Sequence, residues 1–158
     1  MIARYKEHEY LYAVNRRRKE IITTKSQKAD MGFVHEGKLY FKEIRDEDLS
    51  DIFDVEFWIT YRSDIPYAPE QWKLSNEKSV VTNDGVLLVF TEGVLPGWNV
   101  IGKNVCSSRV NISEISGVRM CFLYKKKNGS TCDCLIEERS IAVSELKDYF
   151  DRYNKLAL

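Results

Sequence analysis

The sequence contains little proline and histidine and has no excess of charge of either sign. In 158 residues there are three prolines and two histidines, and Lys plus Arg equal Asp plus Glu at 24 each. A protein that binds nucleic acid through its phosphates needs an excess of basic residues, so a net charge of zero argues against a nucleic-acid partner. Hydrophobic residues at 44% and charged residues at 30% are typical of a folded globular chain.

Long hydrophobic runs and nucleotide-binding loops are also missing. No apolar run approaches the roughly 20 residues of a membrane helix, and the first residues lack the apolar region of a signal peptide. Neither G-x-x-x-x-G-K-[ST] nor G-x-G-x-x-G occurs. We therefore expect a cytoplasmic protein with reduced cysteines, no membrane span and no cofactor.

Two segments, Asp48–Arg62 and Asn111–Lys125, share one apolar spacing. Steps of three residues suit a helical turn, and steps of two suit a strand. The pattern therefore predicts a short turn that leads into an amphipathic strand, used twice, and a duplicated β scaffold. The matching positions, aligned without a gap, are Leu49, Ile52, Val55, Phe57, Ile59 and Tyr61 against Ile112, Ile115, Val118, Met120, Phe122 and Tyr124.

Most of the remaining chain predicts short strands joined by tight turns. Asp84-Gly85 and Asn128-Gly129 lie between apolar runs, where such dipeptides favour hairpins. Residues 63–78 carry two prolines, which exclude a central strand, so we predict a linker there, anchored by Tyr67 and Trp72.

The only helix that we predict lies at the end of the chain. Ser144 is a suitable N-cap, and the acid that follows it complements the helix dipole. One apolar stripe follows at helical spacing and consists of Leu146, Tyr149, Phe150, Tyr153 and Leu156.

Together these patterns predict a mainly β (α+β) fold with antiparallel sheets or a partly open barrel. We expect one compact unit over residues 1–158, built from two related halves, 1–62 and 79–158, joined by the linker 63–78 and closed by the C-terminal amphipathic helix.

Histidines and cysteines offer few candidates for catalysis or metal binding. His8 and His35 sit beside glutamates in predicted turns, without a nucleophile motif nearby, and are expected to be surface residues. The cysteines are Cys106, Cys121, Cys132 and Cys134. Cys132-Asp-Cys134 is C-x-C rather than the C-x-x-C of a zinc knuckle, so buried free thiols are the favoured interpretation. A disulfide or a zinc site stays open as an alternative.

Charged residues gather in three runs. The acidic run comprises Glu43, Asp46, Glu47, Asp48, Asp51, Asp54 and Glu56. It lacks the glycine of a calcium loop, and we expect it to lie along one exposed turn, either as solvated surface or as a docking face for a basic partner. The basic runs Arg16–Lys19 and Lys125–Lys127 are expected at hairpin tips, with contact to phosphate or nucleic acid as the alternative.

Trp58 stands out because it lies on the opposite face of its predicted strand from Val55, Phe57 and Ile59. Either another element covers that face, or Trp58 is an exposed anchor for a partner, since tryptophan is common at binding hot spots. An exposed Trp58 face would also be able to seal a homodimer.

The second half resembles a bacterial pleckstrin-homology-like module. The resemblance rests on the hairpin 80–91, Trp98, Arg109-Val110, the turn and strand start 112–118, and the closing helix 144–155. It implies an adaptor that binds peptide or anionic lipid, for which Lys125, Lys126 and Lys127 would supply the positive charge.

In size, acidic run and lack of a catalytic constellation, the chain is also similar to immunity proteins of bacterial polymorphic toxin systems. That resemblance implies a non-catalytic protein that blocks a toxin domain, often a basic one, by stoichiometric binding. This is our leading hypothesis, and it implies no enzymatic activity. The expected contacts are Asp46, Glu47, Asp48, Asp51, Asp54 and Trp58.

Overall fold

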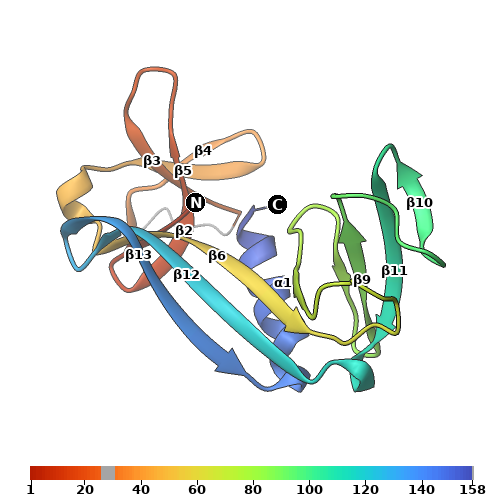
Figure 1. Ribbon diagram of the computed structural model, residues 1–158. Coiled ribbons are helices and arrows are strands. Elements are labelled where there is room, and N and C mark those ends of the chain that lie inside the picture. Colours follow the sequence, from red (N-terminus) through yellow and green to blue (C-terminus); the bar gives the residue numbers. More distant parts are fainter. Residues whose placement is uncertain (26–30, 158) are drawn as a thin grey trace. The chain divides into compact units, whose positions relative to one another are not determined.

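The structure is a computed structural model that describes residues 1–25 and 31–157, without the side chains of residues 133, 134 and 155–157 (Figure 1). Strands make up 52% of it and helices 13%, which confirms the mainly β prediction. The sheets are antiparallel and do not close into a barrel, and α1 (Leu146–Ala157) lies at the C-terminal end, as expected. In the described part of the chain, no helix has the length and apolarity to cross a membrane.

Two sheets contain the strands. The larger has the order β13-β12-β6-β1-β2-β3-β5-β4, with β7 also paired to β6, and the smaller has the order β10-β11-β9-β8. The strands are β1 (Ile2–Tyr5), β2 (His8–Val14), β3 (Glu20–Thr24), β4 (Val34–Glu36), β5 (Leu39–Glu43), β6 (Asp51–Thr60), β7 (Gln71–Lys73), β8 (Val80–Val81), β9 (Gly85–Phe90), β10 (Asn99–Gly102), β11 (Val105–Asn111), β12 (Gly117–Lys127) and β13 (Ser130–Ile141). Short 3-10 helices are η2 (Asp46–Asp48), η3 (Ile112–Glu114) and η4 (Val143–Glu145).

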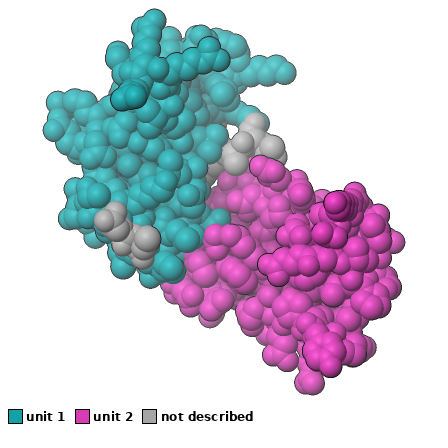
Figure 2. Space-filling view, turned by 45° about the horizontal axis from the view of Figure 1, so that its top comes forward, with its two compact units in different colours: residues 1–55, 122–137, 156–158 teal, residues 56–121, 138–155 magenta. Residues whose placement is uncertain are grey.

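The chain divides into two compact units, which Figure 2 colours separately. Unit 1 comprises residues 1–55, 122–137 and 156–158, and unit 2 comprises residues 56–121 and 138–155. Strands β6, β12 and β13 contribute residues to both units, so each unit contains parts of both predicted halves.

Unit 1 is built around hairpins whose inward side chains form a core. Asn15 shapes the β2–β3 turn, where its carboxamide oxygen accepts the backbone N–H groups of Arg17 at 2.9 Å and Lys19 at 3.0 Å. Between β12 and β13, Asn128 and Gly129 adopt φ of +53° and +80°, which confirms the predicted tight turn. The buried core cluster is Ala3, Tyr5, Tyr10, Ile22, Phe33, Leu49 and Ile52.

In unit 2 the inward face of β6 packs against α1. The ring centroids of Phe57 and Phe150 are 5.4 Å apart, and those of Phe57 and Tyr153 are 6.3 Å apart. Leu146 and Phe150 are buried, as the apolar stripe predicts, whereas the side chain of Leu156 lies outside the described residues.

The predicted N-cap of the helix is wrong. Ser144 lies inside η4, and the Glu145 carboxylate instead accepts the backbone N–H of Ala142 at 3.0 Å. The cap is therefore the carboxylate of Glu145, three residues after Ala142, and not the hydroxyl of Ser144. A carboxylate can take this role because it accepts the free N–H groups at a helix start.

The repeated turn and strand are confirmed, but the gapless alignment describes only the strand faces. Phe57 and Met120 both point inward, as aligned. The turns match differently: Leu49 ends η2 and Ile115 ends η3, and both are buried. Ile115, rather than Ile112, is therefore the counterpart of Leu49, because each directly follows its 3-10 helix, so one gapless alignment does not match both the turns and the strands.

The segment 63–78 contains one short strand that the sequence did not indicate. β7 pairs with β6 and lies at an edge of the sheet, which agrees with the exclusion of a central strand. Trp72 is buried as predicted: its indole N–H donates to the Tyr61 carbonyl at 3.0 Å, and its ring stacks on Trp98 at 5.1 Å. Tyr67 is fully exposed with φ of +68°, so its predicted anchoring role is wrong.

Candidate protein-binding surfaces

The centre of the acidic run is the hydrogen-bonded turn η2 in unit 1. The Asp48 carboxylate accepts the backbone N–H and the guanidinium Nε of Arg45, each at 3.3 Å, and the Leu49 N–H donates to the Asp46 carbonyl at 3.1 Å. The Arg45 guanidinium beside it lowers the pKa of Asp48 below its usual value. The turn therefore presents its carboxylates on a fixed backbone.

Two of the carboxylates of this turn extend well into solvent. The side chain of Glu47 is 67% exposed and that of Asp46 58% exposed. Glu47 pairs with Arg45 at 2.6 Å, an exposed ion pair of the kind that contributes about 0–1 kcal/mol and exchanges readily. Asp46 has a further role, because its carboxylate lies 3.0 Å from the ammonium group of Lys126 and its carbonyl accepts a hydrogen bond from the same group. Asp54, on β6, is 51% exposed and lies 3.2 Å from the N-terminal amine.

Asp51 corrects the expectation of one exposed acidic turn. It is only 2% exposed, at the start of β6. Its carboxylate pairs with the Arg4 guanidinium and accepts the backbone N–H of Asn128 at 2.9 Å. The reason is the strand alternation, which places position 51 on the same inward face as Phe53. Asp51 therefore joins β1 to the β12–β13 turn within unit 1 and does not contribute to the exposed acidic surface.

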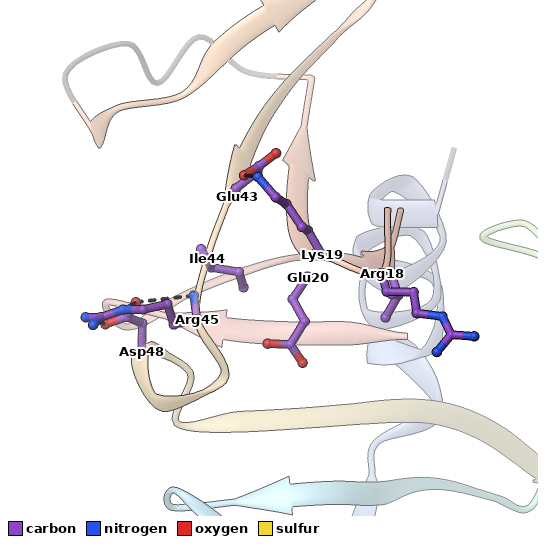
Figure 3. A pocket seen from close by; sticks show the side chains of 8 residues that line it. Arg18, Lys19, Glu20, Glu43, Ile44, Arg45 and Asp48 are labelled. Atoms are coloured by element: carbon purple, nitrogen blue, oxygen red, sulfur yellow. Dashed lines mark hydrogen bonds and ion pairs between the residues drawn. The ribbon is translucent and has the colours of Figure 1, made fainter. Parts of the chain in front are cut away.

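Next to η2 lies a pocket of about 630 Å³, whose lining side chains are drawn in Figure 3. Its size is within the range of ligand sites in proteins. Two ion pairs form part of the wall, Lys19 with Glu43 at 2.6 Å and Arg45 with Asp48 at 3.3 Å. The lining residues are Val14, Arg18, Lys19, Glu20, Glu43, Ile44, Arg45 and Asp48. Sequence reasoning had not singled out a pocket here.

Glu20 differs from the other acids of this pocket. Its carboxylate accepts the hydroxyl of Tyr12 at 2.8 Å, and among the described residues no cation pairs with it. Burial and this hydrogen bond raise the pKa of Tyr12 to about 12. In Figure 3 the Glu20 carboxylate lies below the Lys19–Glu43 pair and to the right of the Arg45–Asp48 pair, while the guanidinium of Arg18 points away from the other labelled side chains.

Trp58 belongs to unit 2, so we treat it as a separate surface. It is partly exposed, on the face of β6 opposite Phe57 and Ile59. Its indole N–H donates to Glu56 at 3.2 Å, and the guanidinium carbon of Arg119 lies 5.9 Å from its ring centroid. Arg119 also reaches Glu138 at 3.3 Å. A ring under a guanidinium and bordered by carboxylates has the composition of an interface anchor.

The alternative basic site is smaller than the sequence suggested. Lys126 is 4% exposed, because it continues the inward alternation of β12. Lys127 pairs with Glu137 at 2.6 Å, which leaves Lys125 as the exposed ammonium group of this run. An anionic ligand at this place would therefore meet one solvent-facing lysine rather than three.

The histidines and the described cysteines form no further site, and Cys121 lies beside the Trp58 surface, with its thiol 3.8 Å from the Glu138 carboxylate. His8 and His35 are exposed next to hairpin turns, and His35 stacks near Tyr40 at 4.7 Å. Cys106, Cys121 and Cys132 are free thiols, whereas the side chain of Cys134 lies outside the described residues. Burial raises the pKa of the Cys121 thiol. The described residues contain no group of three or more histidine, cysteine and acidic side chains arranged to hold a metal ion.

Comparison with known proteins returned no match: no family model fits the chain, and neither curated proteins nor solved structures show significant similarity to it.

Proposed function

We propose that the chain is a non-catalytic protein-binding protein, and specifically an immunity protein that neutralises a bacterial toxin domain by stoichiometric binding. The observation that carries the proposal is the turn η2. Asp48 is held by hydrogen bonds to Arg45 within the turn, and Asp46 and Glu47 are more than half exposed.

A pre-organised acidic turn suits a basic partner for two reasons. The turn needs no further ordering when it binds, so little conformational entropy is lost on association. Its exposed carboxylates would attract a positively charged surface and raise the association rate at low ionic strength. A basic group of the partner would replace the Arg45 guanidinium at Glu47, at little cost because that pair is exposed.

The choice of variants follows from the contacts. Asp46, Asp48 and Asp51 all have structural partners, so replacing them would disturb folding as well as binding. Glu47→Lys changes the most exposed acid of the turn and leaves its hydrogen bonds intact. Glu92→Lys is the matched control, because Glu92 is an exposed glutamate in unit 2 that undergoes the same charge reversal.

The test begins with immobilised chain and lysate of the source cells at low ionic strength. A retained protein is identified by mass spectrometry, expressed on its own in bacteria, and scored for growth inhibition with and without the chain. We expect the chain to restore growth. We also expect Glu47→Lys to weaken binding about tenfold, which is about 1.4 kcal/mol, and to flatten the salt dependence, while Glu92→Lys does neither.

Two outcomes would contradict the proposal. If no protein is retained, or the retained protein is harmless on expression, the immunity function is wrong. If a toxic partner binds Glu47→Lys and the wild-type chain equally at every salt concentration, the function stands but the turn η2 is not the docking site.

A further inference from the structure

We propose that the pocket beside η2 binds a cationic side chain, lysine or arginine, of a partner protein, with Glu20 as its anionic acceptor. This inference rests on the proposed function, since it identifies the chemistry of the partner at a site next to the acidic turn. The argument comes from the orientation of Glu20, from the charges of the pocket wall and from the apolar residues that border it.

Glu20 occupies an inward position of β3. It lies on the same face as Ile22, which is fully buried, and directly opposite Val14 of β2. An inward-facing carboxylate that is partly removed from water needs hydrogen bonds or a positive partner to offset the lost hydration. The Tyr12 hydroxyl supplies one neutral hydrogen bond and leaves the charge of the carboxylate uncompensated.

The other charges of the pocket favour a cation over an anion. Glu43 and Asp48 neutralise Lys19 and Arg45, so neither of these two cations is available to an anionic ligand. The guanidinium of Arg18, an exposed residue, points away from the other labelled side chains (Figure 3). The carboxylate of Glu20 is then the unpaired charge inside the pocket.

The pocket also suits the stem of a lysine or arginine. Val14 is 54% exposed, and Ile44 is half-buried next to the core cluster. Lysine and arginine bury their methylene stems against apolar surface while the charged group meets an acceptor. Val14 and Ile44 would border the stem, and Glu20, within the same pocket, would receive the charge.

Small probes test this site without the partner. The full chain labelled with ¹⁵N is titrated with N-acetyl-argininamide and with N-acetyl-citrullinamide, a neutral analogue of nearly the same shape. We expect the amide signals of Val14, Glu20 and Ile44 to shift with arginine, with a dissociation constant on the order of 1 mM. We expect citrulline to bind at least tenfold more weakly.

Two variants distinguish an ion pair with Glu20 from non-specific binding of arginine. Glu20→Gln keeps an oxygen for the Tyr12 hydroxyl and should bind arginine at least tenfold more weakly, whereas Glu92→Gln should bind as the wild-type chain does. The inference is overturned if arginine leaves the pocket signals unchanged, if citrulline binds equally well, or if Glu20→Gln has no effect. Because no partner takes part, such a result would leave the capture experiment, and with it the proposed function, standing.

Discussion

Asp51 provides the sharpest test of how unit 1 is held together. Replacing it with alanine removes the acceptor of the Arg4 guanidinium and of the Asn128 backbone N–H, both charge-assisted hydrogen bonds. Such bonds contribute about 1.5–3 kcal/mol each. Because the Arg4 side chain is 34% exposed and also reaches Glu9 at 3.3 Å, water and that glutamate replace part of the loss. We expect Asp51→Ala to lower the free energy of unfolding by about 3 kcal/mol.

A conservative variant shows how much of this loss of unfolding free energy comes from the Arg4 contact and how much from the Asn128 contact. Asp51→Asn keeps an oxygen for Asn128 but sets an amide against Arg4, and should cost about 1–1.5 kcal/mol. Asp54→Asn is the matched control: Asp54 lies on the same strand but is 51% exposed, so its loss should stay within about 0.5 kcal/mol. Adding Arg4→Met completes a double-mutant cycle, for which we expect a coupling energy near 1 kcal/mol.

The assay is urea unfolding followed by circular dichroism, together with the melting temperature. A loss of 3 kcal/mol corresponds to a fall of about 6–12 °C for a chain of this length. The reasoning is refuted if Asp51→Ala and Asp54→Asn are equally stable, or if the cycle shows no coupling. Either result would mean that the buried carboxylate does not connect β1 to the β12–β13 turn in solution.

Three further predictions follow from single side chains. Lys126→Ala should lower the free energy of unfolding by about 2–3 kcal/mol in urea titrations, because Lys126 is buried and paired, while Lys125→Ala should change it by less than about 0.5 kcal/mol. The raised pKa of Tyr12 stabilises the fold below pH 10 and this contribution is lost as the pH rises toward 12, so Tyr12→Phe should show a shallower alkaline loss of stability. Iodoacetamide followed by peptide mass mapping should label Cys132, which is partly exposed, faster than Cys121, whose thiol is buried and has a raised pKa.

Features determined by local turn chemistry could be predicted from the sequence. Asp84-Gly85 and Asn128-Gly129 mark the hairpins β8–β9 and β12–β13. Asn128 and Gly129 adopt the positive φ of a tight turn, whereas Gly85 begins β9, where a Cβ would lie 2.8 Å from the Val110 carbonyl oxygen. The helical stripe around Phe150 was likewise visible, since its spacing does not depend on distant residues. β7 was missed because three residues near two prolines give no alternation to detect.

Pairings between distant residues were not predictable in the same way. Arg4 and Asp51 form their ion pair because β1 and β6 are neighbours in the sheet. The sequence around either residue contains no pattern that indicates the other as its partner. The pocket was hidden for a similar reason. Ile21 and Ile22 are consecutive apolar residues, so the sequence does not reveal which face of β3 is inward, and therefore not that Glu20 shares the face of the buried Ile22.

The buried charges themselves, however, continue a pattern that the sequence does contain. The inward positions of β6 are Val55, Phe57 and Ile59, and extending the same alternation toward the start of the strand reaches Asp51. In β12 the alternation through Tyr124 reaches Lys126 at the other end. A charged residue that keeps the inward phase at a strand end is expected to find a partner rather than to face solvent, because an unpaired charge there would lose its hydration.

The contacts of the acids separate structural acids from docking acids. Asp51 and Asp46 are bound to Arg4 and Lys126 within unit 1, and Asp48 caps its own turn. A partner that bound these carboxylates would have to break their contacts within unit 1, and the fold would lose stability. Glu47 is bound only by an exposed pair, and Glu20 only by the neutral hydroxyl of Tyr12. A basic partner would gain most at these two carboxylates, so the binding experiments change Glu47 within the run and Glu20 outside it.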